Sequence, residues 1–486
     1  MITRLTAAFV IGFADGDHVV WRDGEVVYDG PRIVFVGRGY AGPVDRTIEA
    51  GEAIVSPGFI DLDALADIDH ALIDSWHGPE TATGLEWSAD YFNHRRRDVF
   101  PPAEVAFKRE FALSQLIRNG ITTAMPISAE THNVWAETYD DMAETVAIAS
   151  RLGIRLYAGP AYRSGVNVTR DDGSRDVLWN EPLGAEGLAD AIRFVRDFDG
   201  AHEGLIRGCL LPCRIETVTR DLMRATAEAA ESLDCLVRLH SLQGEVELAL
   251  LQKWYGKTPL EVLDEAGLLG PRLLIPHGMY VGGHSRNPAP PKGEVKRIAE
   301  RGVTVIHCPM TSFRYGVALE SFDRYRAAGV NIALGTDSFP PDMIRNMDTG
   351  NHLAQLIDGR ADAGSAADYF RAATLGGARA LRRDDLGRLA PGALADMVVV
   401  DLTDPRVGPV DDPVRTLLLN TTGANIRTVI INGRTVMEDR RISSIDDEAT
   451  RHHVQRYFRT MKEAYCERDF RRRPPDELFP PSFRAA

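Results

Sequence analysis

Between about residue 57 and residue 385, short apolar runs alternate with longer amphipathic segments, and this alternation restricts the fold more than any other feature. Eight runs read as strands: Phe59–Leu62, Thr122–Pro126, Arg155–Gly159, Gly208–Pro212, Leu236–His240, Leu273–His277, Val303–His307 and Asn331–Leu334. Helical segments such as Ala103–Arg118, Met142–Leu152, Arg220–Leu233 and Lys292–Arg301 separate them. This pattern favours an α/β fold, a (β/α)8 TIM barrel, over an open doubly wound sheet. No Gly-x-Gly-x-x-Gly turn follows an early strand, which argues against a dinucleotide-binding sheet.

The two ends of the chain differ from the middle, because short apolar runs alternate there with turns. These runs are His18–Trp21, Gly24–Tyr28 and Arg32–Gly37 at one end, and Ala395–Asp401 and Val429–Val436 at the other. The last run contains Asn432-Gly433, a strong signal for a β-hairpin. We therefore predict a small β-sandwich domain split between residues 1–56 and 386–440, with the barrel at residues 57–385 between its halves.

Residues 441–486 form a third segment, which reads as a helix near Glu448–Glu467 followed by a polar tail with several prolines. Such a tail either frays or packs against a neighbouring subunit. We expect a homo-oligomer.

The composition argues against several classes of function. The formal net charge is −14 and no basic stripe is present, so nucleic-acid binding has no electrostatic support. No apolar run is long enough to span a bilayer, and Met1-Ile2-Thr3-Arg4 does not open a secretory signal. Five scattered cysteines argue for a reducing compartment rather than a disulfide framework. We expect a cytoplasmic protein whose partner is a small-molecule substrate, not a membrane or a nucleic acid.

Four of the expected barrel strands end in residues that can take part in chemistry. His240, His277, His307 and Asp337 stand at or just after the ends of strands five to eight. Because the carboxyl ends of barrel strands meet at one face, we expect these side chains to share a site. Two simpler alternatives remain open. Asp337 alone would cap the next helix, and His307 alone would satisfy hydrogen bonds in the core.

Several motifs around these strand ends follow one another in a specific order. They are Pro57-Gly58-Phe59-Ile60-Asp61, Glu86-Trp87, Asn119-Gly120-Ile121-Thr122-Thr123, Thr258-Pro259-Leu260-Glu261, Pro276-His277-Gly278, His307-Cys308-Pro309-Met310-Thr311-Ser312, Gly335-Thr336-Asp337 and Leu389-Ala390-Pro391-Gly392-Ala393. In this order and spacing the chain, up to about Arg440, resembles the amidohydrolase superfamily. The resemblance is to its cytosine deaminase and chlorohydrolase branch, and it implies a metal-dependent hydrolase.

Two positions depart from the pattern of that branch. Its members follow the first-strand motif with His-x-His, and both histidines bind the metal; here the two positions are Asp63 and Leu65. Asp63 can still ligate a cation through oxygen, whereas Leu65 cannot ligate anything. The family also places a proton-shuttling Glu three residues after the strand-five His, where this chain has Gln243. An amide cannot take up or release a proton near neutral pH, so Glu245 and Glu247 are alternative candidates for that role.

Four candidate metal ligands remain: Asp63, His240, His277 and Asp337. Two imidazoles and two carboxylates can hold one divalent ion (Zn, Fe, Mn or Co) and leave room for a water. In this branch the residue at His277 more often contacts the substrate or the attacking water, so its role stays open. We expect at most one ion per chain, since Leu65 removes a donor and strand four ends in Leu211-Pro212-Cys213-Arg214, without a lysine. The alternative is a metal-free barrel in which these groups hydrogen-bond to one another.

Substrate contacts are expected from Gln243, from His307 and from the segment after strand one, which carries Trp76 and Trp87. A long insertion with aromatic residues over the barrel mouth suits a lid and a pocket wall. Its histidines, His70, His77 and His94, are more simply solvated surface residues than displaced ligands.

These residues lead to two hypotheses. In the first, the protein hydrolyses a C–N or related C–X bond of a small nitrogen-rich compound. A cation lowers the pKa of a water, Asp337 orients and deprotonates that water, and His277 polarises the electrophile or protonates the leaving group. In the second, the barrel is catalytically silent and binds a ligand or a partner subunit. Metal content separates the two.

Overall fold

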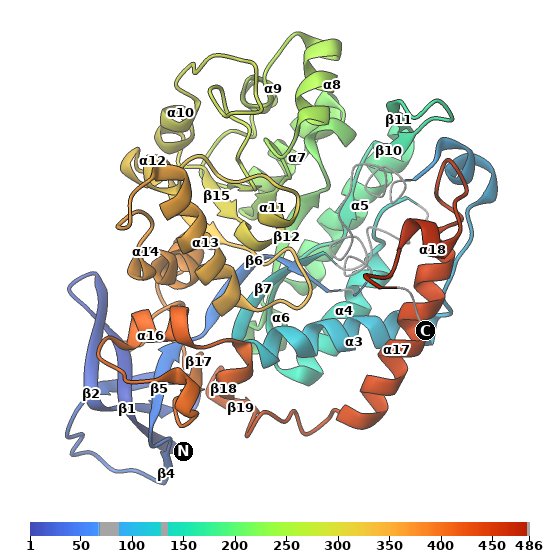
Figure 1. The fold of residues 1–486 in the computed structure, drawn as a ribbon. Coiled ribbons are helices and arrows are strands. Elements are labelled where there is room, and N and C mark those ends of the chain that lie inside the picture. Colours follow the sequence, from blue (N-terminus) through green and yellow to red (C-terminus); the bar gives the residue numbers. More distant parts are fainter. Residues whose placement is uncertain (67, 69–86, 128–134, 484–486) are drawn as a thin grey trace.

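The computed structural model describes residues 1–66, 68, 87–127 and 135–483 (Figure 1). Eight parallel strands follow one another around a barrel: β6 (Phe59–Leu65), β7 (Ile121–Ile127), β8 (Arg155–Ala158), β12 (Ile206–Pro212), β13 (Leu236–Arg238), β14 (Leu273–Pro276), β15 (Thr304–His307) and β16 (Asn331–Leu334). A short strand, β9 (Ala161–Tyr162), also pairs with β12. The first and last strands meet just beyond β16, where the Asp337 amide donates to the Asp63 carbonyl at 2.8 Å. The predicted (β/α)8 barrel is confirmed, and its strands lie within a few residues of their expected bounds.

Helices surround the barrel, and the longer ones bury an apolar stripe against the strands. They are α3 (Pro102–Arg118), α4 (Tyr139–Leu152), α5 (Glu181–Phe198), α6 (Ala201–Gly204), α7 (Arg220–Leu233), α8 (Glu245–Tyr255), α9 (Pro259–Glu265), α10 (Glu294–Glu300), α11 (Pro309–Arg314), α12 (Phe322–Ala327), α13 (Met343–Asp358), α14 (Ala366–Arg371) and α15 (Gly377–Ala380). In α7, for example, Leu222, Thr226 and Ala230 lie on the buried side at four-residue spacing. Thr219 caps this helix by accepting from the Leu222 amide, which fixes where the helix begins.

Strands from both ends of the chain form one eight-stranded sheet, shown in blue and orange in Figure 1. They are β1 (Ile2–Ala14), β2 (Asp17–Asp29), β3 (Arg32–Gly37), β4 (Arg46–Glu49), β5 (Ala53–Pro57), β17 (Met397–Asp401), β18 (Ile426–Ile431) and β19 (Arg434–Met437). The halves join where β5 pairs with β17, with Val55 opposite Val399. At the predicted hairpin, Asn432 and Gly433 both have positive φ, at 53° and 75°, as a two-residue β-turn requires.

One expected turn in this sheet does not form. The runs before and after Gly24 were expected to be separate strands, whereas β2 continues through Gly24 and pairs along its length with β1. The partner explains this difference: a thirteen-residue strand supplies hydrogen bonds on both sides of the glycine, and these outweigh the weak strand propensity of one residue.

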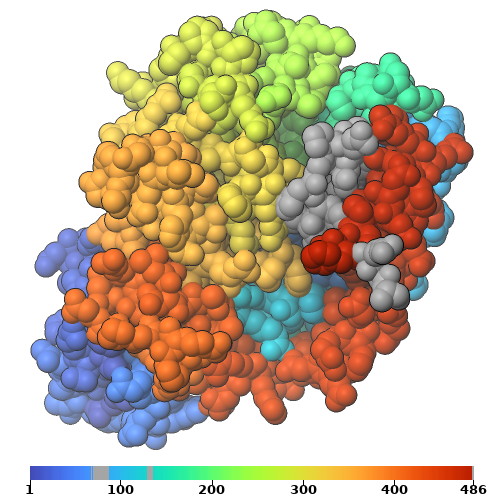
Figure 2. All heavy atoms as spheres, in the orientation of Figure 1, coloured from blue at the N-terminus to red at the C-terminus, as the bar shows by residue number. Residues whose placement is uncertain are grey.

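The C-terminal segment packs on its own chain, so the alternative in which its tail frays is wrong for the described residues. Helix α17 (Asp447–Tyr465) buries Tyr457, Met461 and Tyr465 in a cluster with Phe111 of α3. The short helix α18 (Pro475–Leu478) contributes Leu478 to the same cluster. Beyond α17, the residues shown in red in Figure 2 form ion pairs with the segment after β6, namely Arg97 with Glu467 and Asp90 with Arg472. This segment therefore forms part of the wall around the barrel. None of the described helices could cross a membrane.

A buried ion pair connects the sheet to the barrel. Arg155 of β8 lies 3.1 Å from the Asp396 carboxylate, which precedes β17, and the two side chains are 1% and 4% exposed. Asp396 also accepts from the Asn432 amide at 2.6 Å, so it holds the hairpin as well.

We therefore expect Asp396→Asn to reduce the free energy of unfolding by about 3–5 kcal/mol, because the Arg155 charge would stay buried without its partner. Chemical denaturation measures this effect. The matched control, Asp190→Asn, breaks the exposed Arg193–Asp190 pair and should cost less than about 1 kcal/mol. Equal losses in the two variants would contradict a structural role for the buried pair.

Candidate metal centre

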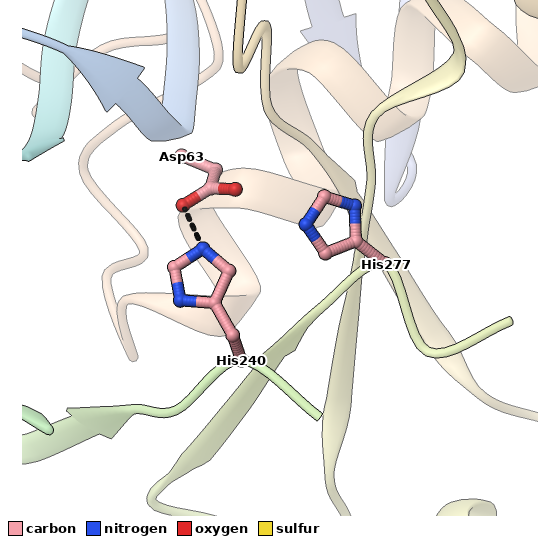
Figure 3. A group of neighbouring side chains, drawn as sticks. All are labelled: Asp63, His240 and His277. Carbon is pink, nitrogen blue, oxygen red and sulfur yellow. Dashed lines mark ion pairs between the residues drawn. The ribbon is translucent and has the colours of Figure 1, made fainter. Parts of the chain in front are cut away.

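Asp63, His240 and His277 come together at the carboxyl ends of three barrel strands (Figure 3). Asp63 belongs to β6, and the two histidines follow β13 and β14. The three side chains are buried, and their potential ligand atoms lie within 4.8 Å of one another. His277, Cys308 and Asp337 form a second group with the same spacing. The structure therefore divides the four expected ligands between two overlapping groups, which share His277.

The hydrogen bonding of His240 fixes how its ring faces Asp63. Its Nδ1 lies 2.9 Å from the Cys213 carbonyl oxygen. Because a carbonyl can only accept, Nδ1 carries the hydrogen, and Nε2 faces the Asp63 Oδ1 at 3.4 Å. In a neutral ring the His240 Nε2 is an acceptor, so it faces a second acceptor, the Asp63 Oδ1, without a hydrogen between them. Either a proton or a cation between them would make the contact favourable.

Two buried atoms of this cluster have no hydrogen-bond partner among the described residues. They are Asp63 Oδ1 and His277 Nε2, in side chains that are 0% and 2% exposed. A buried polar atom without a hydrogen-bond partner costs about 1–3 kcal/mol. Binding of an ion is one way to satisfy such an atom. The donor set and its unsatisfied atoms therefore fit one divalent cation.

A fixed positive charge also lies beside Asp63. The Arg238 Nη1 is 3.4 Å from the Asp63 Oδ1, and the same nitrogen donates to the Met125 carbonyl at 2.6 Å. Burial opposes ionisation of Asp63, but His240, Arg238 and His277 outweigh burial and hold the pKa of its carboxyl well below the usual range. Asp63 is therefore a carboxylate whether or not a cation is bound.

His277 is held neutral, and the backbone on both sides of the site is strained. Burial lowers the pKa of His277 to about 3, and its Nε2 lies 3.8 Å from the Asp337 Oδ2. His277 and Asp337 have φ values of 67° and 41°. This left-handed conformation costs a non-glycine residue on the order of 1 kcal/mol and is concentrated at functional sites. Asp337 is 14% exposed, so it can meet both the site interior and an incoming molecule.

The position of the missing shuttle glutamate is occupied by an amide bound to an arginine. The Arg214 Nη1 donates to the Gln243 Oε1. Glu245 is exposed at the start of α8, whereas Glu247 is buried and accepts from the Leu242 and Gln243 amides at 2.7 and 3.0 Å. Burial and the nearby Glu216 raise the pKa of Glu247 to about 8. Glu247 therefore holds the turn after β13 in place, and both of its oxygens are already engaged.

The expected substrate contacts have different surroundings. His307 lies among core rings, with its Nε2 3.5 Å from the Tyr369 hydroxyl and its ring centroid 6.1 Å from that of Phe322, while its buried Nδ1 has no hydrogen-bond partner among the described residues. Trp87 is half-buried, and the Arg468 guanidinium lies 4.1 Å above its ring, so it can form a wall. Exposed His94 lies in the π-helix η1 (Tyr91–Arg95). Trp76, His70, His77 and Glu86 lie outside the described residues.

Sequence reasoning missed two members of the cluster, Arg238 and Cys308. Arg238 is the last residue of β13 and His240 follows it by two residues, and both side chains contact Asp63. An arginine in the apolar run Leu236–His240 was the available signal. For Cys308 no signal was available, because a buried cysteine ordinarily behaves as a small apolar residue.

The family model for "Amidohydrolase family" matches residues 54–436. The chain belongs to the amidohydrolase family. The predicted family is thereby confirmed, and so is the predicted class of enzyme, a hydrolase of C–N or related bonds.

This amidohydrolase is similar to three proteins of known kind. It is 26% identical over 434 residues to 5-methylthioadenosine/S-adenosylhomocysteine deaminase of Pyrococcus abyssi, and this alignment covers 87% of the present chain and 92% of the relative. It is 26% identical over 433 residues to 5'-deoxyadenosine deaminase of Methanosarcina mazei, covering 88% and 91%. An adenosine deaminase from Xanthomonas campestris with bound zinc has the same fold, with a TM-score of 0.76, 23% identity and coverage of 95% and 98%.

The burial of His307 predicts a dependence of stability on pH. Burial lowers the pKa of His307 to about 3 in the folded protein, against about 6.5 in the unfolded chain. The unfolded chain therefore binds the extra proton first, and stability is lost as the pH falls from 6.5 towards 3. Between pH 7.5 and 5 this group alone should cost about 2 kcal/mol.

In His307→Gln this part of the loss should disappear, which denaturation curves at the two pH values measure. His352→Gln changes an exposed side chain and should keep the wild-type slope. An unchanged slope in His307→Gln would show that His307 is accessible to protons in the folded state.

Proposed function

We propose that this chain is a hydrolytic deaminase of small amino-substituted nitrogen heterocycles, that adenosine-type nucleosides are the first to test, and that it uses one divalent cation. The observation that carries the proposal is the pair of overlapping ligand groups formed by Asp63, His240, His277 and Asp337 with Cys308, in which two buried ligand atoms lack a hydrogen-bond partner among the described residues. The names of the relatives support the substrate class, because they are deaminases of adenosine derivatives.

Asp63, His240, His277 and Asp337 would hold the cation. When bound, a divalent cation supplies Lewis-acid chemistry, which lowers the pKa of a water and polarises the carbon under attack. Zinc is the first ion to test, since the adenosine deaminase with the same fold contains it. Leu65 offers no donor, so we propose one ion per chain.

Asp337 acts as the general base. Asp63 is already tied to Arg238 at 3.4 Å, which leaves Asp337 as the carboxylate of the set that can exchange a proton. A water oxygen bonds to the ring carbon that carries the amino group, and Asp337 accepts a proton from that water. The C–N bond then breaks and ammonia leaves, with Asp337 returning the proton to the departing nitrogen. His277 is neutral, so it orients the electrophile rather than supplying a charge.

Gln243 and Trp87 position the substrate. The Gln243 Oε1 accepts from Arg214, so its NH2 group is directed away from that contact and can donate to an acceptor on the heterocycle. Trp87 supplies an aromatic wall, and Trp76 is proposed for the same role.

One observation favours a second candidate function, a metal-free ligand-binding barrel. Arg238 already neutralises part of the Asp63 charge, and a protonated His240 could complete the pairing without a cation. In that case the purified protein would bind a heterocycle without releasing ammonia. Elemental analysis and an ammonia assay, each with and without added zinc, separate the two candidates.

For the enzyme, we expect Asp337→Asn to lower turnover by about 10²- to 10⁴-fold, because the general base is lost. Ammonia release from adenosine, 5'-deoxyadenosine and methylthioadenosine measures this effect, and circular dichroism checks the fold. Gln243→Ala should raise KM with a smaller effect on kcat. The control Asp348→Asn changes a carboxylate on α13 that pairs with His352 and should leave turnover unchanged. Full activity in Asp337→Asn would exclude this mechanism.

A further inference from the structure

We propose that the thiol of Cys308 is an additional metal ligand and takes the place of the imidazole that the chain lacks at Leu65. The inference rests on the proposed function, because it concerns the same cation. Cys308 directly follows β15 and is fully buried. Its Sγ lies 3.7 Å from the Asp63 Oδ2, and it shares the 4.8 Å group with His277 and Asp337.

The spacing of the donor atoms suits ligands of one ion. Zinc bonds of about 2.0–2.3 Å place neighbouring ligand atoms of one ion roughly 3–4 Å apart. Three contacts in the cluster have this spacing: His240 to Asp63 at 3.4 Å, Cys308 to Asp63 at 3.7 Å and His277 to Asp337 at 3.8 Å. The unpaired His277 Nε2 is 98% buried within the group that contains the thiol, and it points independently to a ligand there.

Charge gives a second reason for a thiolate. The Arg238 guanidinium contributes one positive charge beside Asp63, and a divalent ion would bring the total to three. Asp63 and Asp337 supply two negative charges, and a thiolate at Cys308 supplies the third. Asp61 does not belong to this group, because its carboxylate accepts from the Thr336 amide and hydroxyl. On binding, the S–H bond breaks, a sulfur–metal bond forms and the proton leaves to solvent.

No other cysteine joins a potential metal group in the described part of the chain. Cys213 contacts His240 through its backbone carbonyl. Cys235 is a buried thiol just before β13 and packs in the hydrophobic core. It is therefore a matched control for loss of a buried thiol.

The test loads the full-length protein with cobalt(II) and records its absorption spectrum. We expect a thiolate-to-cobalt charge-transfer band in the near ultraviolet for the wild type and for Cys235→Ser. In Cys308→Ser the band should be absent while the visible cobalt bands persist. Cobalt affinity should fall at least about tenfold, since even partners outside the ligand shell have effects of that size.

The other outcomes contradict either the thiol ligand alone or the thiol ligand together with the proposed function. Cobalt binding without the band in the wild type, or with the band retained in Cys308→Ser, excludes the thiol as a ligand and leaves the proposed function standing. Failure of the wild type to bind cobalt or zinc overturns both. If Cys308→Ser does not fold, the ¹¹³Cd NMR shift of the cadmium-loaded wild type decides, because thiolate ligation moves it strongly downfield.

Discussion

The site depends on one close approach, where the last barrel strand meets the first. The Asp337 amide donates to the Asp63 carbonyl at 2.8 Å, and the Thr336 amide donates to the Asp61 Oδ1 at 3.0 Å. A side chain at Gly335 would prevent this contact, because its Cβ would lie 2.5 Å from the Asp63 Cβ. The glycine therefore lets the barrel close with two ionisable strand ends side by side. That closure places Asp337 within reach of His277.

Much of this arrangement was predictable from the sequence. The alternation of apolar runs and amphipathic segments predicted the barrel. The position of His240, His277 and Asp337 at strand ends predicted a shared site, because parallel strands all end at one face. The split sheet followed from the short apolar runs that alternate with turns at both ends of the chain. The individual strands, helices and turns are local features, so residue type and spacing encode them.

What could not be predicted depends on long-range pairing. The continuous strand β2 exists because β1 supports it, and no local signal at Gly24 shows this. Arg238 and Cys308 contact Asp63 because β6, β13 and β15 lie close together in the barrel. The C-terminal segment packs against α3 and forms ion pairs with residues after β6. The same contacts explain how the chain tolerates Asp63 at a histidine position, since a buried carboxylate needs a nearby positive charge. Arg238 provides it.

The central claim is that the strand ends at this closure bind one cation. Anomalous diffraction from zinc-loaded crystals tests it most directly. The account predicts one anomalous peak per chain, within bonding distance of Asp63, His240, His277 and Asp337. The absence of a peak there, with His240 bonded directly to Asp63, would contradict it.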